Sequence, residues 1–246
     1  MAKRTTKTST GGRKATLSHI PGDFALAVGM PPAPEAPLGW KWVPLSSVAR
    51  MESGHTPSRR HPEYWGGDVP WIGIKDAKAN HGGVILETLE CTNQLGLENS
   101  SARLLPAKTV CLSRTASVGY VTIMGKPMAT SQDFVNWICG DALMPEFLAY
   151  LFLAEKSALL RFASGAVHQT IYFPEAKAMH ACIPDIEEQA RIVRLLDEVF
   201  LETESALAKV VKQLTLFEEL RRSILQRALT GGRDARNRAS THEVLG

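Results

Sequence analysis

The side chains best suited to chemistry stand in three short polar stretches. Residues 53–76 (SGHTPSRRHPEYWGGDVPWIGIKD) combine arginine, lysine and histidine with glycine, proline and aromatic residues. Residues 128–134 (MATSQDF) and 164–173 (SGAVHQTIYF) add amide, hydroxyl and imidazole groups. Arginine fits the paired acceptors of guanine, glutamine pairs with adenine, and serine or threonine binds phosphate or base. Three such loops on one small rigid domain would suit sequence-specific contact with DNA.

The candidate DNA contacts are the polar side chains of these stretches and of the segments beside them. They are Thr56, Ser58, Arg59, Arg60, His61, Lys75, Lys78, Arg114, Ser131, Gln132, His168, Gln169 and Tyr172. The alternative is a set of plain surface loops whose aromatic residues close the core. We favour that alternative for Trp71, and for Arg59, Gln132 and His168 the two interpretations are balanced.

The first stretch is also rich in residues that shape the backbone. Its glycines allow tight turns and close approach to a ligand. Pro57, Pro62 and Pro70 each remove a backbone donor, so we expect neither a regular helix nor a central strand there.

Signatures of catalysis are sparse. The sequence contains no P-loop, Rossmann glycine motif, H-E-x-x-H or G-x-S-x-G pattern, and no N-P-P-Y or D-P-P-Y tetrapeptide. Glu175 and Lys177 form an E-x-K pattern found in many metal-dependent nucleases, with Asp133 or Asp141 as a possible partner. Three residues with one free position often match by chance, so a nuclease is only an alternative, and a surface salt-bridge face is the simpler interpretation.

Composition predicts a soluble cytoplasmic protein. Apolar residues make up 44% of 246 residues, charged residues 22%, and the formal net charge is +3. No run approaches the length of a membrane span. The four cysteines are scattered without a C-x-x-C pair, which indicates buried reduced thiols and neither a zinc site nor a redox dithiol.

The chain divides into four parts. Residues 1–38 predict a basic disordered tail and a proline-rich linker, and residues 231–246 a second basic tail. Residues 39–183 alternate short extended segments with one strong helical run at 144–163, and therefore predict a single globular α+β domain. The extended segments expected are 42–51, 69–74, 83–87, 109–113, 118–124 and 134–138.

Residues 184–230 predict one long helix, on the order of 65 Å at 1.5 Å per residue. Asp185 is the expected N-cap, Glu188 completes a capping-box pattern, and Gly231 suits a left-handed C-cap. Apolar residues recur every three or four positions along it. The predicted partner-helix contacts are Ile192, Leu196, Val199, Val210, Leu214, Phe217, Leu220 and Ile224.

A helix of this length cannot bury its stripe on a domain of about 140 residues, which spans only about half that distance. We therefore expect the stripe to pack against another long helix, from a second copy or a related chain. The stripe alone leaves the direction of pairing open. Folding back into an ordinary core is the less favoured alternative.

Several segments, in order, resemble the specificity subunit of type I restriction–modification systems. These are residues 54–76, TVCLSRTASVGYVTI, ATSQDF, SGAVHQTI, IPDIEEQARIVRLLDEV and LRRSILQRALTGG. ATSQDF departs from the family's A-T-N-Q motif by having Ser131 in place of asparagine. The resemblance covers roughly residues 40–232.

The resemblance implies a non-catalytic target-recognition domain followed by a spacer helix. Family members usually carry two such domains and two helices that pair antiparallel, whereas this chain has one of each, so it implies a half-subunit that pairs with itself or with another half-subunit. The implied partners are double-stranded DNA, a methyltransferase subunit that uses S-adenosylmethionine, and a restriction subunit driven by ATP with Mg²⁺. No cofactor is implied for this chain. A truncated, inactive remnant and a coiled-coil adaptor without DNA contact are the remaining alternatives.

Overall fold

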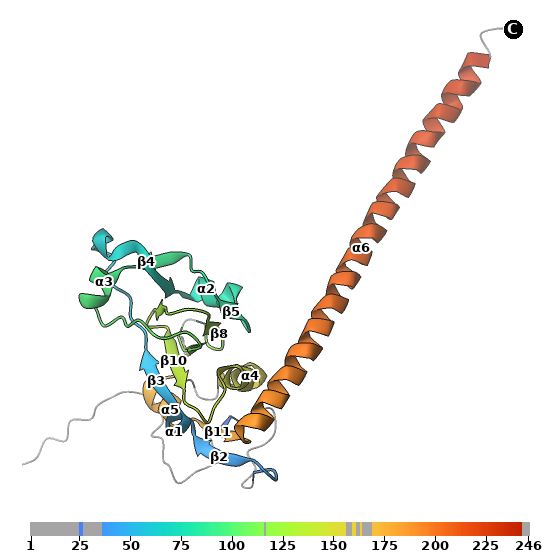
Figure 1. Ribbon diagram of the computed structural model, residues 1–246. Coiled ribbons are helices and arrows are strands. Elements are labelled where there is room, and N and C mark those ends of the chain that lie inside the picture. The colour runs from blue at the N-terminus through green and yellow to red at the C-terminus, as the bar shows by residue number, and fades with distance from the viewer. Residues whose placement is uncertain are drawn as a thin grey trace, which may run out of the picture. The chain divides into compact units, whose positions relative to one another are not determined.

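The computed structural model describes residues 25–26, 36–115, 117–155, 159–160, 163 and 169–242, and describes side chains for those between 36 and 230. The chain separates into two compact units, one ending at Val193 and the other beginning at Arg194. Figure 1 shows the mixed strands and helices of the first unit and the long helix α6. The predicted α+β class is confirmed.

A five-stranded sheet forms the centre of the first unit, in the order β3-β10-β7-β8-β5. Its neighbours are antiparallel except β5 and β8, which are parallel. Four predicted segments appear as strands in this sheet. The strands are β3 (Ala49–Ser53), β5 (Val84–Ile85), β7 (Val110–Ser113), β8 (Val121–Met124) and β10 (Phe134–Cys139).

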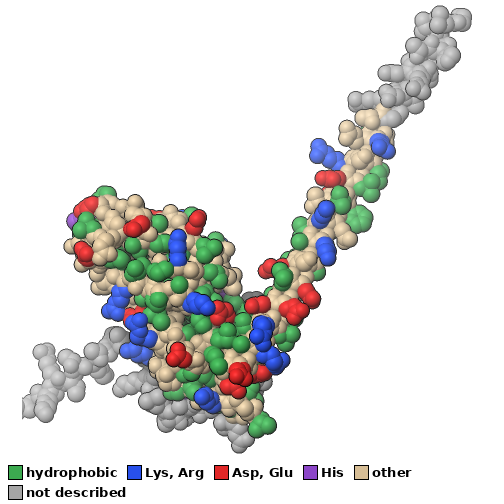
Figure 2. All heavy atoms as spheres, viewed as in Figure 1, with side chains coloured by type: hydrophobic (Ala, Val, Ile, Leu, Met, Phe, Trp, Pro, Cys, Tyr) green, Lys and Arg blue, Asp and Glu red, His purple; other side chains and the backbone are tan. Residues whose placement is uncertain are grey.

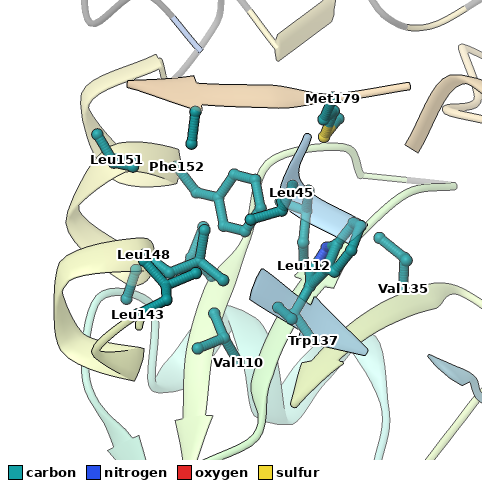
Figure 3. Packing of buried hydrophobic residues seen from close by; sticks show 14 of the residues in the cluster. Leu45, Val110, Leu112, Val135, Trp137, Leu143, Leu148, Leu151, Phe152 and Met179 are labelled. Atoms are coloured by element: carbon teal, nitrogen blue, oxygen red, sulfur yellow. The ribbon is translucent and has the colours of Figure 1, made fainter. Parts of the chain in front are cut away.

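Helix α4 (Pro145–Glu155) covers this sheet, packing on β7 and β8 (Figure 1). Phe152 and Leu148 of the helix meet Leu112 and Trp137 of the strands, and all four side chains are fully buried (Figure 3). The helix begins at Pro145 as its fixed φ favours. It ends at Glu155, sooner than predicted, and residues 159–160 form a 3₁₀ turn.

A second sheet carries the first polar stretch, in the order β6-β4-β9. Its strands are β4 (Trp65–Ile72), β6 (Glu90–Thr92) and β9 (Ala129–Thr130), and the short helices η1 (Pro62–Tyr64), α2 (Ile74–Ala79) and α3 (Gln94–Glu98) flank them. The expectation that this stretch holds no central strand is wrong. β4 tolerates Pro70 because its pairing with β9 starts only at Trp71, and its register with β6 shifts between Trp65 and Val69.

A third sheet, in the order β1-β11-β2, lies at the other end of the unit (Figure 1). Its strands are β1 (Ala25–Leu26), β2 (Lys41–Pro44) and β11 (His180–Ile183), with helices α1 (Leu45–Val48) and α5 (Phe173–Lys177) beside them. The predicted tail is therefore wrong at residues 25–26, since parallel pairing with β11 satisfies their backbone. The segment 42–51 is two strands, β2 and β3, separated by the turn of α1 that buries Leu45.

The long helix is α6 (Ile186–His242). Asp185 caps it as predicted, with Oδ1 accepting from the backbone N–H of Glu188 at 2.9 Å. The reciprocal half of the capping box is replaced by an ion pair, because the Glu188 carboxylate binds Arg191 through two hydrogen bonds of 2.7 Å. The helix passes its predicted end at Thr230, so residues 231–242 are helical instead of a tail. Gly231 lies inside it, where glycine costs only about 1 kcal/mol relative to alanine.

The start of α6 is part of the globular unit, which moves the boundary predicted at residue 183 to Val193. Gln189 is fully buried. Its side-chain amide accepts from Met144 N at 2.9 Å and donates to the carbonyls of Ala142 and Pro184 at 3.0 Å. The first turns of the helix are thereby tied to the loop before α4.

The cysteine prediction is confirmed in part. All four thiols are free, but only Cys111 is buried, while Cys91, Cys139 and Cys182 are half-buried. Burial raises the pKa of the Cys139 thiol to about 12, with a smaller contribution from Glu146. No helix in the described ranges is both long enough and apolar enough to span a membrane.

Candidate nucleic-acid interface

The first and second polar stretches meet at Gly54. A Cβ at this position would lie 1.9 Å from the carbonyl oxygen of Ser131 and 2.2 Å from Thr130 Oγ1. Only glycine therefore allows the loop after β3 to approach the end of β9 so closely. One residue later, His55 N donates to the Thr130 carbonyl at 2.9 Å, which fixes the loop in that position.

A side-chain bond then connects two of the predicted contacts. Thr56 Oγ1 donates to Gln132 Oε1 at 2.5 Å, across 76 positions of sequence. Gln132 is exposed and Thr56 is half-buried. The exposed amide of Gln132 is therefore presented from a fixed position, which is what base recognition requires.

Ser131 does not share this exposure. Its side chain is buried, with 2% of its surface exposed, so it is not accessible to DNA in this structure and the predicted contact is corrected. The hydroxyl instead donates to Asp133 Oδ2 at 3.0 Å, and the other oxygen of Asp133 accepts from Thr115 Oγ1 at 2.5 Å. Ser131 and Asp133 shape the loop that carries Gln132.

Arg114 connects the second and third polar stretches. Its Nε donates to the Gln132 carbonyl at 3.1 Å and its Nη1 to the Ile171 carbonyl at 3.4 Å. The guanidinium lies over the Phe173 ring, 4.4 Å from the centroid. Burial lowers the pKa of Arg114, and the nearby Asp133 partly opposes this shift. Arg114 is therefore a half-buried brace between loops, a role that the sequence did not indicate.

The third stretch is described only in part. His168 lies outside the described residues. Gln169 is exposed, and Tyr172 has 37% of its surface exposed. Because Arg114 binds the carbonyl between them, these two side chains lie on the segment that Arg114 holds beside Gln132.

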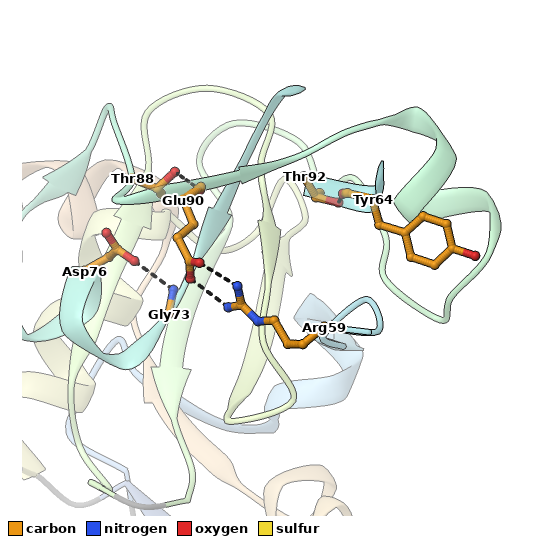
Figure 4. Close-up of polar contacts among 7 residues, drawn as sticks. All are labelled: Arg59, Tyr64, Gly73, Asp76, Thr88, Glu90 and Thr92. Atoms are coloured by element: carbon orange, nitrogen blue, oxygen red, sulfur yellow. Dashed lines mark hydrogen bonds and ion pairs between the residues drawn. The ribbon is translucent and has the colours of Figure 1, made fainter. Parts of the chain in front are cut away.

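Arg59 is held on the second sheet by an acidic and an aromatic partner. Its two terminal nitrogens donate to the two carboxylate oxygens of Glu90 at 2.5 and 2.7 Å, as Figure 4 shows. Its guanidinium stacks 3.7 Å from the Trp65 ring centroid, with Trp71 at 5.2 Å. The hydrogen bonds that Arg59 donates to Glu90 raise the pKa of Arg59 and lower the pKa of Glu90. Both side chains remain about half exposed.

The side chains around Arg59 have different environments. His61 Nδ1 is 2.9 Å from Glu63 Oε1, and its ring stacks on Tyr64 at 4.8 Å. Ser58 Oγ accepts from the backbone N–H of Arg60 at 3.4 Å. The guanidinium of Arg60 is exposed and forms no hydrogen bond or ion pair within the described residues.

Two predicted contacts, Lys75 and Lys78, lie exposed on α2. Lys75 is close enough to Glu90 to contribute to its lowered pKa. The predicted core role of Trp71 is confirmed, since it is 6% exposed and its Nε1 donates to the His55 carbonyl at 3.1 Å. Trp71 thus supports both the Arg59 cluster and the Gly54 loop.

Acidic residues moderate the charge of this surface. Figure 2 shows Lys and Arg side chains interspersed with Asp and Glu on the face it presents.

Glu90 is the clearest member of the candidate site that the sequence did not reveal, because it lies 31 positions from Arg59. No local spacing rule connects residues so far apart.

The nuclease alternative finds no support. Glu175 is buried, with 2% of its surface exposed, whereas Lys177 is exposed. The two side chains therefore do not form a common polar site. Among the described residues, no group of three His, Cys, Asp or Glu side chains could hold a metal ion.

The second unit carries the predicted partner face. Val199, Val210, Leu214, Phe217, Leu220 and Ile224 have between 45% and 69% of their surfaces exposed. Hydrophobic side chains follow α6 along its described length in Figure 2. Leu196 is half-buried, and Ile192 packs against the core of the first unit, so Ile192 is not free for a partner.

A family comparison gives this arrangement its context. Residues 37–213 match the type I restriction modification DNA specificity domain. The chain belongs to this family. The matched segment spans the three polar stretches and the first part of α6, in agreement with the resemblance inferred from the sequence.

Two curated relatives are specificity subunits of type I restriction enzymes. The MjaIX subunit of Methanocaldococcus jannaschii is 31% identical over 163 residues, which are 65% of this chain and 38% of that protein. The HindI subunit of Haemophilus influenzae is 37% identical over 122 residues, or 49% of this chain and 26% of the relative. The chain thus spans well under half the length of either relative.

Solved structures show the same fold. One is a chain from a type I R-M system, studied for complex assembly and conformational transition. It aligns with a TM-score of 0.65 at 20% identity, and the alignment covers 80% of this chain and 47% of the solved chain. The HsdS subunit of Thermoanaerobacter tengcongensis gives a TM-score of 0.56 at 20% identity, and the alignment covers 72% of this chain and 41% of the HsdS chain. Both alignments cover less than half of the known structure.

Proposed function

We propose that this chain is a sequence-specific DNA-binding specificity subunit of a type I restriction–modification system, without catalytic activity of its own. The observation that supports this best is the connected set of Thr56, Gln132 and Arg114 with the Gln169–Tyr172 segment, on a chain of the DNA specificity family. These contacts hold exposed hydrogen-bonding groups from three loops in fixed positions. Fixed positions allow a base edge to be distinguished.

Chemistry would belong to other chains. A modification subunit would supply S-adenosylmethionine-dependent methylation, and a restriction subunit would supply ATP- and Mg²⁺-dependent translocation and cleavage. This chain would bind DNA and position those subunits on it. Salt would weaken its binding strongly, because phosphate contacts release counterions.

The test of this function is a methylome of cells that express the chain with its cognate modification subunit. We expect new methylated sites that share one sequence motif. Methylation at the same sites in cells with the modification subunit alone would contradict the proposal. Cleavage of DNA by the purified chain with Mg²⁺ alone would favour the nuclease alternative instead.

The exposed stripe of α6 supports pairing of two copies through antiparallel helices. Twofold symmetry would then place two recognition domains on an inverted-repeat site. A palindromic bipartite methylation motif would agree with a homodimer. An asymmetric motif would contradict the homodimer and indicate pairing with a different half-subunit.

A charge on the stripe tests this pairing directly. Leu214→Glu replaces an exposed stripe residue and is expected to dissociate the dimer in light scattering. Leu201→Glu is the matched control, since Leu201 is also exposed but lies on the opposite helix face at 3.6 residues per turn. A dimer that survives Leu214→Glu would reject this interface.

A further inference from the structure

A second cationic cluster lies outside the predicted contacts, at the edge strand β3. Arg50 and Arg103 both donate Nη1 hydrogen bonds to Glu52, one to each carboxylate oxygen, and the Arg103 bond measures 2.5 Å. The Glu52 side chain is only 10% exposed, whereas those of Arg50 and Arg103 are 64% and 61% exposed. A buried carboxylate thus holds two largely exposed guanidinium groups.

The charges of this cluster do not cancel. One arginine would neutralise Glu52, so the second leaves a net positive charge. Each guanidinium has five N–H donors and gives one to Glu52, which leaves most donors for a ligand. Because Glu52 restrains both side chains, little side-chain entropy remains to be lost on binding. A planar guanidinium with open donors suits a phosphate.

A shallow cleft extends the cluster away from the recognition loops. Arg50 lines it together with Lys177 from α5 and Ser46 and Ser47 from α1. Lys177 is exposed on α5. The cleft therefore adds a third cation beside Arg50 on a concave surface.

Strand pairing and one side-chain hydrogen bond join the cluster to the loops at Gly54 and Gln132. Glu52 pairs in register with Asn136 of β10, and Asn136 donates to Thr130 Oγ1 at 2.8 Å, beside Gly54. Arg50 precedes Thr56 by six positions, at most about 20 Å at 3.3 Å per residue. That distance corresponds to about six base pairs at 3.4 Å each. DNA backbone beside the bases that the loops would meet could therefore lie within reach of the cluster.

We infer that Arg50 and Arg103, oriented by Glu52, form a phosphate clamp for the backbone of duplex DNA flanking the recognised bases. The inference rests on the proposed DNA-binding function. The clamp would contribute affinity without sequence preference, because every base pair presents the same phosphates.

The test measures salt dependence in the complex of the full chain with its modification subunit. Binding to a duplex that contains the methylome motif, and to a scrambled duplex, is followed by fluorescence anisotropy from 50 to 200 mM salt. Arg103→Gln leaves Glu52 paired with Arg50 and is expected to reduce the slope of log K against log salt by about 0.9, one phosphate contact. The triple variant R50Q/E52Q/R103Q leaves no unpaired buried carboxylate. It removes the same single net positive charge and is expected to reduce the slope by about 0.9 as well.

Arg191→Gln is the matched control. Arg191 is 60% exposed and is also bound to a glutamate, Glu188, but it lies on α6. The slope of log K against log salt for the Arg191→Gln complex is expected to equal that of the wild type. The preference for the motif over the scrambled duplex is expected to stay unchanged in all variants.

The outcomes separate the clamp from the function on which it rests. Wild-type slopes in Arg103→Gln and in the triple variant, with motif preference retained, would overturn the clamp alone. A changed motif preference in Arg103→Gln would overturn the assignment to phosphate. Absence of motif preference in the wild-type complex would overturn the proposed function itself.

Discussion

Arg114→Lys is the most informative single change, because Arg114 braces two recognition loops at once. Lysine keeps the positive charge but has one terminal nitrogen, so it cannot donate to both the Gln132 and Ile171 carbonyls from the same place. It also loses the planar group that stacks on Phe173. The backbone bonds of Arg114, from its N to the Asp133 carbonyl at 2.7 Å and from Ile171 N at 2.9 Å, remain. The domain is therefore expected to fold.

The expected loss follows from these contacts. One charge-assisted hydrogen bond contributes about 1.5 kcal/mol at the low end, which suits the 3.4 Å distance to Ile171. Stacking on the ring contributes about 0.5 kcal/mol. The sum is about 2 kcal/mol, and at about 2 kcal/mol per molar urea the unfolding midpoint falls by about 1 M.

Urea unfolding of the full chain, followed by tryptophan fluorescence, measures this shift. Arg60→Lys is the control, because Arg60 is exposed and changes on such surfaces stay within about 0.5 kcal/mol. We also expect Arg114→Lys to weaken the preference for the methylome motif, since Gln132 loses its fixed position. An unfolding midpoint and a motif preference both equal to those of the wild type would refute the role of Arg114 as a brace.

Three further changes test other parts of the site. Gln132→Ala is expected to lose about 1–3 kcal/mol of discrimination at one base pair with little change in stability, and competition binding that shows unchanged site choice would remove Gln132 from the contacts. Glu90→Gln breaks the exposed pair with Arg59 and is expected to cost at most about 1 kcal/mol in urea unfolding. Arg59 lowers the pKa of Glu90 below its ordinary value of 4.5, so the difference in the free energy of unfolding between Glu90→Gln and wild type is expected to be constant above that pH and to shrink as pH falls further. A difference in the free energy of unfolding that does not change with pH would contradict the ion pair. Gly54→Ala is expected to destabilise the domain by about 1–3 kcal/mol through overlap with the facing carbonyl, whereas Gly83→Ala, with its nearest atom at 3.6 Å, is the control that should unfold like wild type.

Features encoded by nearby residues were predictable from the sequence. The Asp185 cap depends on a residue three positions away, and the start of α4 depends on the fixed φ of Pro145. The amphipathic repeat of α6 also comes from short spacings. Each follows from rules that operate within one or two helical turns.

Features encoded by distant residues were not predictable. Pairing of Arg59 with Glu90 depends on how β4 and β6 associate, and burial of Ser131 depends on the loop at Gly54. The same limit explains the error at Pro70, where a proline fits a central strand because the partner strand begins one residue later. Composition identified the polar loops. Only the tertiary contacts show which of their side chains are exposed and which are buried and hold the loops in place.

Glu90 has a consequence for how Arg59 would meet DNA. Its two carboxylate oxygens occupy the terminal nitrogens of Arg59, as the paired acceptors of guanine would. Glu90 is in this sense an intramolecular competitor for the same donors. A base with a single acceptor would replace only one of the two bonds lost, whereas guanine would replace both. In the proposed complex, this competition would weaken binding at a mismatched site more than at a matched one.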